Sequence, residues 1–490
     1  MPPSATFYIE SHRGLTLYNR MVFGQFLEHF HRQVYGGVFE PGSPLADGRG
    51  FRRDVIEALR ELRVPIVRWP GGCFVSAYHW QDGVGPIRRP AYDKAWRVED
   101  ANTFGTDEFV AWCGEIGAQP YLCTNAGTGS AEEMSDWVEY CNLPAQGRWA
   151  RQRIANGCPA PHQVRYWSIG NENYGGWEMG AKTSEEWSRF VVEGAKMMRR
   201  VDPGIQLLAA ALPDLDWTLN LLRKAGGYLD MVSIHGYYDG LWQNDQPSSY
   251  LACMMRVGQV EAAIRTTEQI IALAGCEGKI KIAFDEWNLR GWHHPEGNSP
   301  EAIAARDRND RNATYTMADA VFSAGFLNTC LRHAGNVQMA NMAPVINTRG
   351  PLYVHPDGVV RRTTFHVLAM YANLLADHVA EAFIASDALT HEGQSVPVFD
   401  GLATCGAAMS GWRIALINRH PQQSLTCKVL IGGRPLEGQY AATILSGDSP
   451  DAYNDVEQPA RVAPEKGVLN FVSGSAALPP HSVAILEVNE

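Results

Sequence analysis

Two apolar runs in this chain each lead directly into a glutamate that has an aromatic residue nearby. The first, 166–169, continues through Gly-Asn to Glu172, and the second, 280–286, finishes on Glu286. Runs of this length and composition are typical of buried strands. Glu172 could simply help to cap a later helix, but the repeated pattern favours two carboxyl groups that meet across one pocket. Such a pair is the equipment of glycoside hydrolysis.

Strand-like and helix-like segments alternate through most of the chain. The predicted strands cover 19–28, 65–72, 119–125, 165–172, 205–211, 229–235, 280–286 and 337–342. Segments with helical spacing lie between and after them, among them 184–201, 250–274 and 302–333. Eight strand–helix units predict an α/β fold of the (β/α)8 TIM-barrel type. An open doubly wound sheet is the competing fold, but the turn at 70–73 lacks its Gly-x-Gly-x-x-Gly pattern.

The pattern changes after about residue 377. Short alternating runs separated by turn clusters predict a C-terminal antiparallel β-sandwich, jelly-roll-like in type. We expect the piece 5–11 to add a strand to it. The predicted division is an N-terminal segment, 1–18, that packs with the sandwich, a catalytic barrel, 19–376, and the sandwich itself, 377–490.

Composition limits the partners of this 490-residue chain. A net charge of −11 and a pI of about 5.8 give no support for binding to nucleic acid or an anionic membrane, both of which call for basic patches. The ten cysteines form no Cys-x-x-Cys pair, so zinc and redox motifs are unsupported. We find neither a signal-peptide pattern nor an apolar run of membrane length, and expect a cytoplasmic protein.

A barrel of this type builds its active site at the C-terminal ends of its strands. Polar side chains stand at many of the predicted ends: Glu28, Arg68, Asn125, Asn171, Glu172, His235, Tyr237, Glu286, Asn341 and Asn347. Flat apolar faces for sugar rings are offered by Trp69, Trp177, Trp287 and Trp292. Single residues have structural alternatives, because Arg68 could form a buried ion pair and His235 could be a core histidine. Their joint placement predicts one carbohydrate pocket.

Strand order suggests a role for each of the two glutamates. A retaining glycosidase needs two carboxyl groups roughly 5–5.5 Å apart, one protonated and one ionised. We expect Glu172 to be the general acid/base, with its pKa raised by the negative charge of Glu286. Glu286 would be the nucleophile, kept ionised by a cationic or donor-rich neighbourhood for which Arg68 and Tyr237 are candidates. Asn171 would hydrogen-bond a ring hydroxyl beside the reacting carbon.

The chain resembles glycoside hydrolase family 51, the α-L-arabinofuranosidases, within a clan of retaining (β/α)8 glycosidases. The matching stretches are Gly-Gln-Phe-Leu-Glu-His at 24–29, Tyr-Gly-Gly-Val-Phe-Glu at 35–40, the long block 68–86, Trp-Ser-Ile-Gly-Asn-Glu at 167–172, Phe-Asp-Glu-Trp-Asn at 284–288 and the closing 478–487. The resemblance implies that Glu172 is the acid/base and Glu286 the nucleophile. It also implies an arabinose subsite lined by Glu28, Asn171 and Tyr237, with Arg68 and Cys73 beside it.

We therefore expect a retaining, exo-acting α-L-arabinofuranosidase that acts on short arabinose-substituted oligosaccharides without a metal or cofactor. The resemblance also suggests a homo-oligomer, often a hexamer. A polar segment, 292–301, reads as a loop over the site.

Three departures from the family pattern touch the edge of the sugar pocket: 173–176, Arg290 and Pro344. They leave another sugar open, such as β-D-galactofuranose or β-D-xylose, or internal cleavage of a glucan. A catalytically silent carbohydrate-binding protein is the alternative from another class, because a fold alone does not establish a function.

Overall fold

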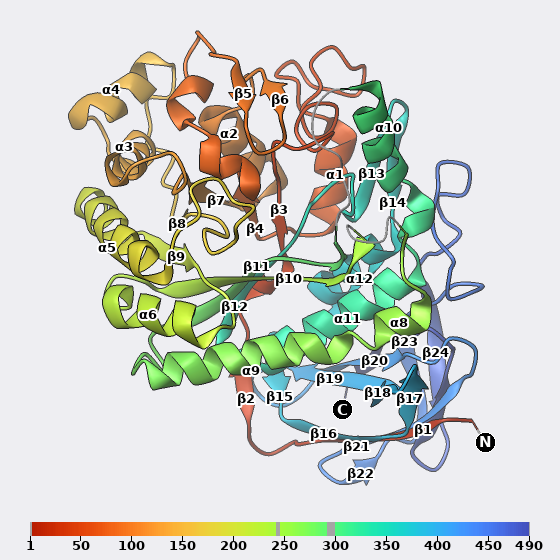
Figure 1. The fold of residues 1–490 in the computed structure, drawn as a ribbon. Coiled ribbons are helices and arrows are strands. Elements are labelled where there is room, and N and C mark those ends of the chain that lie inside the picture. Colours follow the sequence, from red (N-terminus) through yellow and green to blue (C-terminus); the bar gives the residue numbers. More distant parts are fainter. Residues whose placement is uncertain (1, 242–245, 292–298, 490) are drawn as a thin grey trace.

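Eight parallel strands close into a barrel, around which the helices are arranged (Figure 1). A computed structural model describes residues 2–241, 246–291 and 299–489. The barrel strands are β3 (Gly24–Phe26), β4 (Ile66–Trp69), β7 (Gln119–Thr124), β8 (Tyr166–Ile169), β9 (Gln206–Ala210), β10 (Met231–Asp239), β11 (Lys281–Arg290) and β12 (Val337–Met342). They pair in chain order, and β12 pairs with β3 to close the barrel. The predicted barrel is confirmed.

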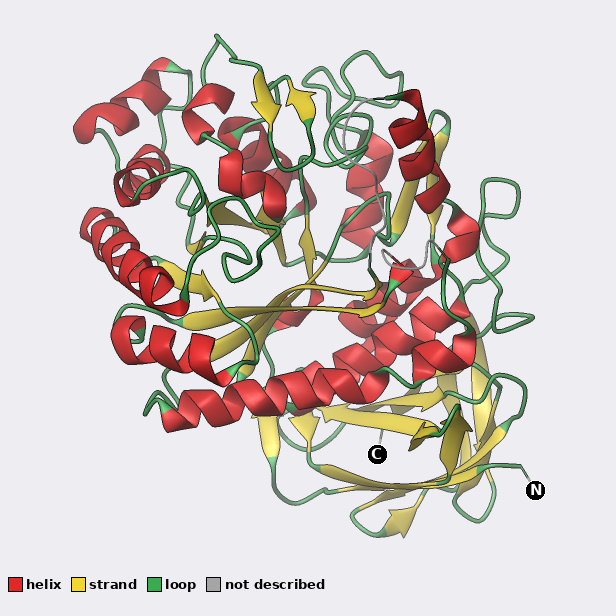
Figure 2. Ribbon diagram, viewed as in Figure 1, coloured by secondary structure: helices red, strands yellow, loops and turns green. Residues whose placement is uncertain are grey.

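Helices cover the outside of the barrel (Figure 2), and several begin where the sequence supplies a cap. They are α1 (Arg53–Glu61), α2 (Thr106–Ile116), α3 (Ala131–Asn142), α4 (Gly147–Ala155), α5 (Ser184–Val201), α6 (Leu215–Ala225), α8 (Tyr250–Met254), α9 (Val257–Leu273), α10 (Pro300–Asn309), α11 (Met317–Arg332) and α12 (Thr363–Leu374). At α5, the Thr183 side chain accepts from the Glu186 amide, and the Glu186 carboxylate accepts from the Thr183 amide. This capping box starts α5 at its predicted first residue.

Strands β10 and β11 continue past the residues at which we predicted their ends. After a register shift that follows Ser233, His235 pairs with Glu286 and Asp239 pairs with Arg290. We call these paired extensions, 235–239 and 286–290, the β10–β11 ribbon. The prediction stopped short because the extensions carry polar side chains, which here find partners on each other and on neighbouring elements.

Other predicted elements are shorter than expected. Strand 19–28 begins as a 3-10 helix, Arg20–Phe23, because the Asn19 side chain accepts a hydrogen bond from the Met21 amide. The predicted helix 250–274 is split into α8 and α9, and 302–333 is split into α10 and α11. A second capping box, formed by Thr316 and Asp319, starts α11. Of the predicted loop 292–301, residues 300 and 301 belong to α10, and 292–298 lie outside the described residues.

The sequence prediction missed two hairpins that project from the barrel. One joins β5 (Ala91–Asp93) to β6 (Val98–Asp100), and the other joins β13 (Leu352–His355) to β14 (Gly358–Arg361).

The C-terminal part is a β-sandwich of two main sheets, with a separate two-stranded sheet formed by 388–391 and 394–397. Its strands are β15 (His378–Ala380), β16 (Ala382–Ser386), β17 (Ala388–His391), β18 (Gln394–Pro397), β19 (Phe399–Cys405), β20 (Trp412–Asn418), β21 (Leu425–Ile431), β22 (Arg434–Pro435), β23 (Gly438–Leu445), β24 (Glu465–Phe471), β25 (Ser475–Leu478) and β26 (Ser482–Val488). The N-terminal strands join both sheets: β1 (Ser4–Ile9) lies between β16 and β21, and β2 (Leu15–Leu17) pairs with β15. Pairing is antiparallel except between β1 and β21. These pairings support the limits 1–18, 19–376 and 377–490, which we propose as the domain boundaries.

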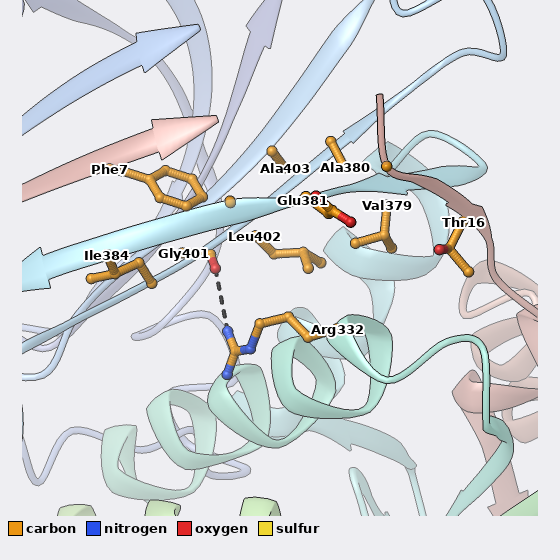
Figure 3. A pocket seen from close by; sticks show the side chains of 12 residues that line it. Phe7, Thr16, Arg332, Val379, Ala380, Glu381, Ile384, Gly401, Leu402 and Ala403 are labelled. Carbon is orange, nitrogen blue, oxygen red and sulfur yellow. Dashed lines mark hydrogen bonds between the residues drawn. The ribbon is translucent and has the colours of Figure 1, made fainter. Parts of the chain in front are cut away.

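Helix α11 joins the barrel to the sandwich (Figure 1). It is buried along almost its whole length, because it contacts β11 on one side and β19, β20 and β26 on the other. At its end, Arg332 donates to Asp400 of β19 at 2.7 Å, and Arg419 donates to the same carboxylate at 2.6 Å. A cavity of about 370 Å³ lies at this junction, beside Arg332 (Figure 3), and none of the predicted site residues lines it.

Within the described residues, no helix combines the length and the apolar character that crossing a bilayer would require. The ten cysteines are all free thiols.

Candidate active site

The two glutamates singled out in the sequence meet at the C-terminal end of the barrel. Glu172 follows β8 and Glu286 lies in β11, on the β10–β11 ribbon. A carboxylate oxygen of each, together with a ring nitrogen of His235, form a group whose atoms all lie within 4.8 Å of one another. The predicted approach of the two carboxyl groups is thus present in the fold.

Glu286 is held by two donors. Arg68 Nη1 donates to its Oε2 at 2.7 Å, and the Tyr237 hydroxyl donates to its Oε1 at 2.5 Å. Arg68, in β4, is fully buried, and Asp285 Oδ2 from β11 lies 3.5 Å from its Nε. Both oxygens of Glu286 are therefore oriented, and one of them faces a positive charge. Sequence reasoning expected both donors.

Glu172 stands on a sharp turn at the end of β8. Its φ of +45° lies in the left-handed region, which residues other than glycine rarely adopt. His235 Nδ1 lies 2.8 Å from its Oε1, and Trp177 Nε1 donates to its Oε2 at 2.9 Å. Burial raises the pKa of Glu172, but His235, together with Trp177 and Arg68, outweighs burial, and the pKa is lowered. The expectation of a pKa raised by Glu286 was wrong for this arrangement, because it left His235 out.

His235 lies between the two glutamates. Its Nδ1 is 3.6 Å from Glu286 Oε2, and its Nε2 is 3.5 Å from Asp285 Oδ1. Burial lowers the pKa of His235, but Glu286, together with Asp285 and Glu172, raises it to about 10. The structure therefore gives His235 carboxylate partners. Its predicted contact with substrate stays a prediction.

Glu28 follows β3 and contacts a glycine turn. Its Oε1 accepts hydrogen bonds from the amides of Gly72 and Phe74 at 3.1 and 3.2 Å, and from Trp96 Nε1 at 3.3 Å. A Cβ at Gly71 would lie 2.2 Å from the Glu28 Cγ, so only glycine allows this approach. Burial, with help from the charge of Glu286, raises the pKa of Glu28 to about 8. Glu28 therefore holds a proton at neutral pH.

The remaining predicted residues take different positions. Asn171 is buried between two partners: its Oδ1 accepts from Arg68 Nη2 at 2.7 Å, and its Nδ2 donates to Glu178 at 3.2 Å. Cys73 Sγ belongs to a group with carboxylate oxygens of Glu172 and Glu178, all within 4.8 Å of one another. Trp177 is 62% exposed, so much of its ring remains free.

Two predicted tryptophans are core residues. Trp69 is fully buried and stacks on Phe109, and Trp287 is 1% exposed and stacks on Phe326. Their expected role as sugar platforms was wrong, because β4 and β11 direct these rings toward the packed helices. Trp292 lies outside the described residues.

Sequence reasoning also missed residues of the site. Asp285 contacts Arg68, His235, Ser233 and Tyr121; Glu178 contacts Asn171; Trp96 contacts Glu28; and Arg349 lies over the Tyr237 ring with its Cζ 4.3 Å from the centroid. A signal existed for Asp285, which is adjacent to Glu286. Nothing in the sequence marked Glu178 or Arg349.

Two of the three departures from the family pattern are buried side chains. Arg290 is 1% exposed, and its guanidinium binds Asp239 at 2.6 Å and Asp319 at 3.0 Å. Pro344 is buried as well. Among the residues that the structure describes, three groups of side chains bring possible metal-ligand atoms within 4.8 Å of one another, and two of them consist of the pocket residues above. The carboxylates of these two groups already have the partners described above. The independence from metal that we expected stays a prediction.

Comparison with known proteins places the chain in a family. A family model described as the alpha-L-arabinofuranosidase 1 domain matches residues 58–254, and one described as the alpha-L-arabinofuranosidase C-terminal domain matches residues 285–482. The chain is 34% identical, over 440 residues and 87% of each chain, to an intracellular exo-alpha-(1->5)-L-arabinofuranosidase of Halalkalibacterium halodurans.

Solved structures give the same result. An α-L-arabinofuranosidase from Thermotoga maritima in complex with arabinose has a TM-score of 0.89 and 31% identity, covering 99% of this chain and 100% of its own. A family 51 α-L-arabinofuranosidase from Bifidobacterium longum has a TM-score of 0.90 and 30% identity, with both chains fully covered. With matched domains, relatives and structures in agreement over nearly its whole length, the chain belongs to glycoside hydrolase family 51, the α-L-arabinofuranosidases.

Proposed function

We propose that this glycoside hydrolase removes terminal α-L-arabinofuranosyl residues from arabino- and arabinoxylo-oligosaccharides, with retention of configuration. The observation that carries the proposal is the approach of Glu172 and Glu286, whose nearest oxygens lie within 4.8 Å. Retaining enzymes hold their carboxyl groups roughly 5–5.5 Å apart, whereas inverting enzymes leave roughly 6.5–9.5 Å for a water molecule. The spacing supports a double displacement.

In the first step, Glu286 attacks the anomeric carbon while Glu172 gives its proton to the leaving oxygen. A covalent glycosyl–enzyme ester forms and the glycosidic bond breaks. In the second step, Glu172 takes a proton from water, the water oxygen attacks the same carbon, and Glu286 is released as a carboxylate. Arg68 and Tyr237 hold Glu286 in place for both steps.

The acid role of Glu172 requires a proton in this part of the pocket. The pair of Glu172 and His235, 2.8 Å apart, provides a place for it, because the pKa of His235 is raised to about 10. In the resting pair this proton stays on His235, because the same contact lowers the pKa of Glu172.

The alternative sugars rested on Arg290 and Pro344. The guanidinium of Arg290 already binds Asp239 and Asp319, so it is not a free donor for a different sugar. The effect of Pro344 on the preferred sugar is tested by the substrate panel below. A silent carbohydrate-binding protein would retain the same catalytic pair without turnover, and only assays separate it from an enzyme.

The test is a panel of 4-nitrophenyl glycosides that includes the α-L-arabinofuranoside. We expect that substrate to be cleaved best. Glu286→Ala should lose activity on every substrate. Glu172→Ala should lose roughly 10²–10⁴-fold on poor leaving groups but less on 4-nitrophenyl, because that group leaves without a proton, and azide should partly restore it. Full activity in Glu286→Ala would contradict the assignment of Glu286 as the nucleophile.

Three further features are proposed with this function. A cytoplasmic location is supported by the relative named intracellular. A homo-oligomer, with a hexamer among the expected states, follows from the family resemblance and is tested by light scattering. Independence from metal and cofactor predicts full activity after dialysis against EDTA.

A further inference from the structure

Glu178 is a carboxyl group of the pocket that has no part in the two steps above. Glu178 lies on the loop after Glu172 and is 3% exposed. One of its oxygens, an oxygen of Glu172 and the Cys73 Sγ all lie within 4.8 Å of one another. A third carboxyl group therefore adjoins the acid/base directly.

Glu178 also ends a line of contacts that starts at the nucleophile. Arg68 binds Glu286 through Nη1 and the Asn171 carbonyl oxygen through Nη2, each at 2.7 Å. The amide nitrogen of Asn171 then donates to Glu178 Oε2 at 3.2 Å. An amide held at both ends keeps one orientation, so Glu178 helps to fix Asn171 beside the reacting carbon.

The charge around Glu172 gives Glu178 a second role. His235 and Trp177 both donate to Glu172 and favour its ionised form, although the first step needs it protonated. A like charge nearby disfavours ionisation. Glu178 supplies such a charge above a pH of about 7, because burial and Glu172 raise its pKa to about 7 against hydrogen bonds from neighbouring side chains.

We propose that Glu178 is a positioning residue for the acid step, which fixes the Asn171 amide and, when ionised, favours the protonated form of Glu172. This inference rests on the proposed glycosidase function. The titratable groups that face Glu178 are Cys73, from the 3-10 helix Cys73–Ala77, and Glu172 and Tyr174 from its own loop. The pKa values of Cys73 and Tyr174 are raised well above their usual ranges, so neither adds charge near neutrality.

Glu178→Gln separates charge from hydrogen bonding, because glutamine keeps an acceptor for Asn171. The readout is kcat/KM against pH, which reports the free enzyme. With an oligosaccharide substrate, the basic limb of the kcat/KM profile should shift to a pH about one unit lower. A shift of this size is the effect of removing a like charge at this distance. With 4-nitrophenyl α-L-arabinofuranoside, which needs little protonation, the limb should move less.

Two further variants act as matched controls. Glu178→Asp keeps the charge but shortens the reach to Asn171, so it should keep the limb in place and lower kcat/KM. Glu193→Gln removes an exposed carboxylate from α5 and should leave both the limb and the rate unchanged. A limb that stays in place in Glu178→Gln would overturn the proposal.

Thermal unfolding adds a readout that needs no turnover. Wild-type stability should fall as pH rises from about 4.5 to about 7, because over this window the unfolded chain loses the Glu178 proton and the folded chain retains it. Glu178→Gln lacks this effect, so the difference between its Tm and that of the wild type should increase as pH rises across the window. A Tm difference independent of pH would also overturn the proposal. If no glycoside is cleaved, the proposed function fails, and the Tm comparison still tests Glu178.

Discussion

The carboxyl groups of this pocket differ in charge because their neighbours differ. Glu286 faces the guanidinium of Arg68, and Glu172 faces His235, whose pKa is raised to about 10. Glu28 receives only neutral donors and lies near the charge of Glu286, which together with burial raises its pKa to about 8. The same residue type therefore supplies one partner of a guanidinium, one hydrogen-bonded partner of an imidazole and one neutral acid.

The neutral state of Glu28 has a cost that depends on pH. Its pKa is about 8 in the folded chain and near 4.5 in the unfolded chain, so wild-type stability should fall as pH rises between these values. The fall is roughly 1.4 kcal/mol per pH unit within the window. Glu28→Gln should therefore gain in Tm over the wild type from pH 5 to pH 8. A gain that is equal at both pH values would show that Glu28 is ionised when folded.

At the scale of elements, the β10–β11 ribbon carries much of the site. It presents Tyr237 and Glu286 to the pocket and is closed at its far end by Arg290. Arg290 binds Asp239 across the ribbon and Asp319 at the start of α11, and all three side chains are buried. The orientation of the nucleophile therefore depends on an ion pair several residues away.

Removing this buried cation should cost more than removing a surface one. Arg290→Met leaves Asp239 and Asp319 buried without compensation, and we expect a loss of roughly 3–5 kcal/mol together with a lower kcat. Replacing Asp319 by Asn in the same chain should recover part of the loss. The control is Arg361→Met, whose exposed pair with Glu61 should be worth about 1 kcal/mol or less. Urea unfolding measures all three, and equal losses would contradict the account.

The barrel strands could be predicted because their apolar runs are buried whatever the details of the loops. The ribbon could not, because 235–239 and 286–290 are rich in polar residues whose partners lie on other elements. The residues of the site were hard to predict for the same reason, because their partners also lie on other elements. The glutamates were found from strand ends, whereas Glu178 and the bridging position of His235 depend on distances that no local pattern carries.

At the scale of the molecule, the N-terminus completes the sandwich rather than the barrel. Strand β1 places Phe7 and Ile9 in the sandwich core, with Phe7 fully buried against Phe399. Alternation along a strand turns Tyr8 outward, where it is 45% exposed. The sandwich in turn covers α11, which packs against β11.

Phe7 and Tyr8 form a matched pair for testing this arrangement. Phe7→Ala should destabilise the chain by about 3–5 kcal/mol, the usual cost of deleting a buried aromatic ring, and lower the Tm. Tyr8→Ala should have a much smaller effect. Both variants should keep the wild-type kcat at 25 °C, since neither residue approaches the pocket. Equal Tm values for the two would contradict the position of β1 in the core.

The most direct test of the two-carboxylate mechanism is the configuration of its product. Hydrolysis of 4-nitrophenyl α-L-arabinofuranoside in dilute methanol should transfer part of the sugar to the alcohol, and proton NMR identifies the anomer formed. Double displacement through Glu286 predicts methyl α-L-arabinofuranoside. The β-anomer would show a single displacement and would contradict the assignment of Glu286 as the nucleophile.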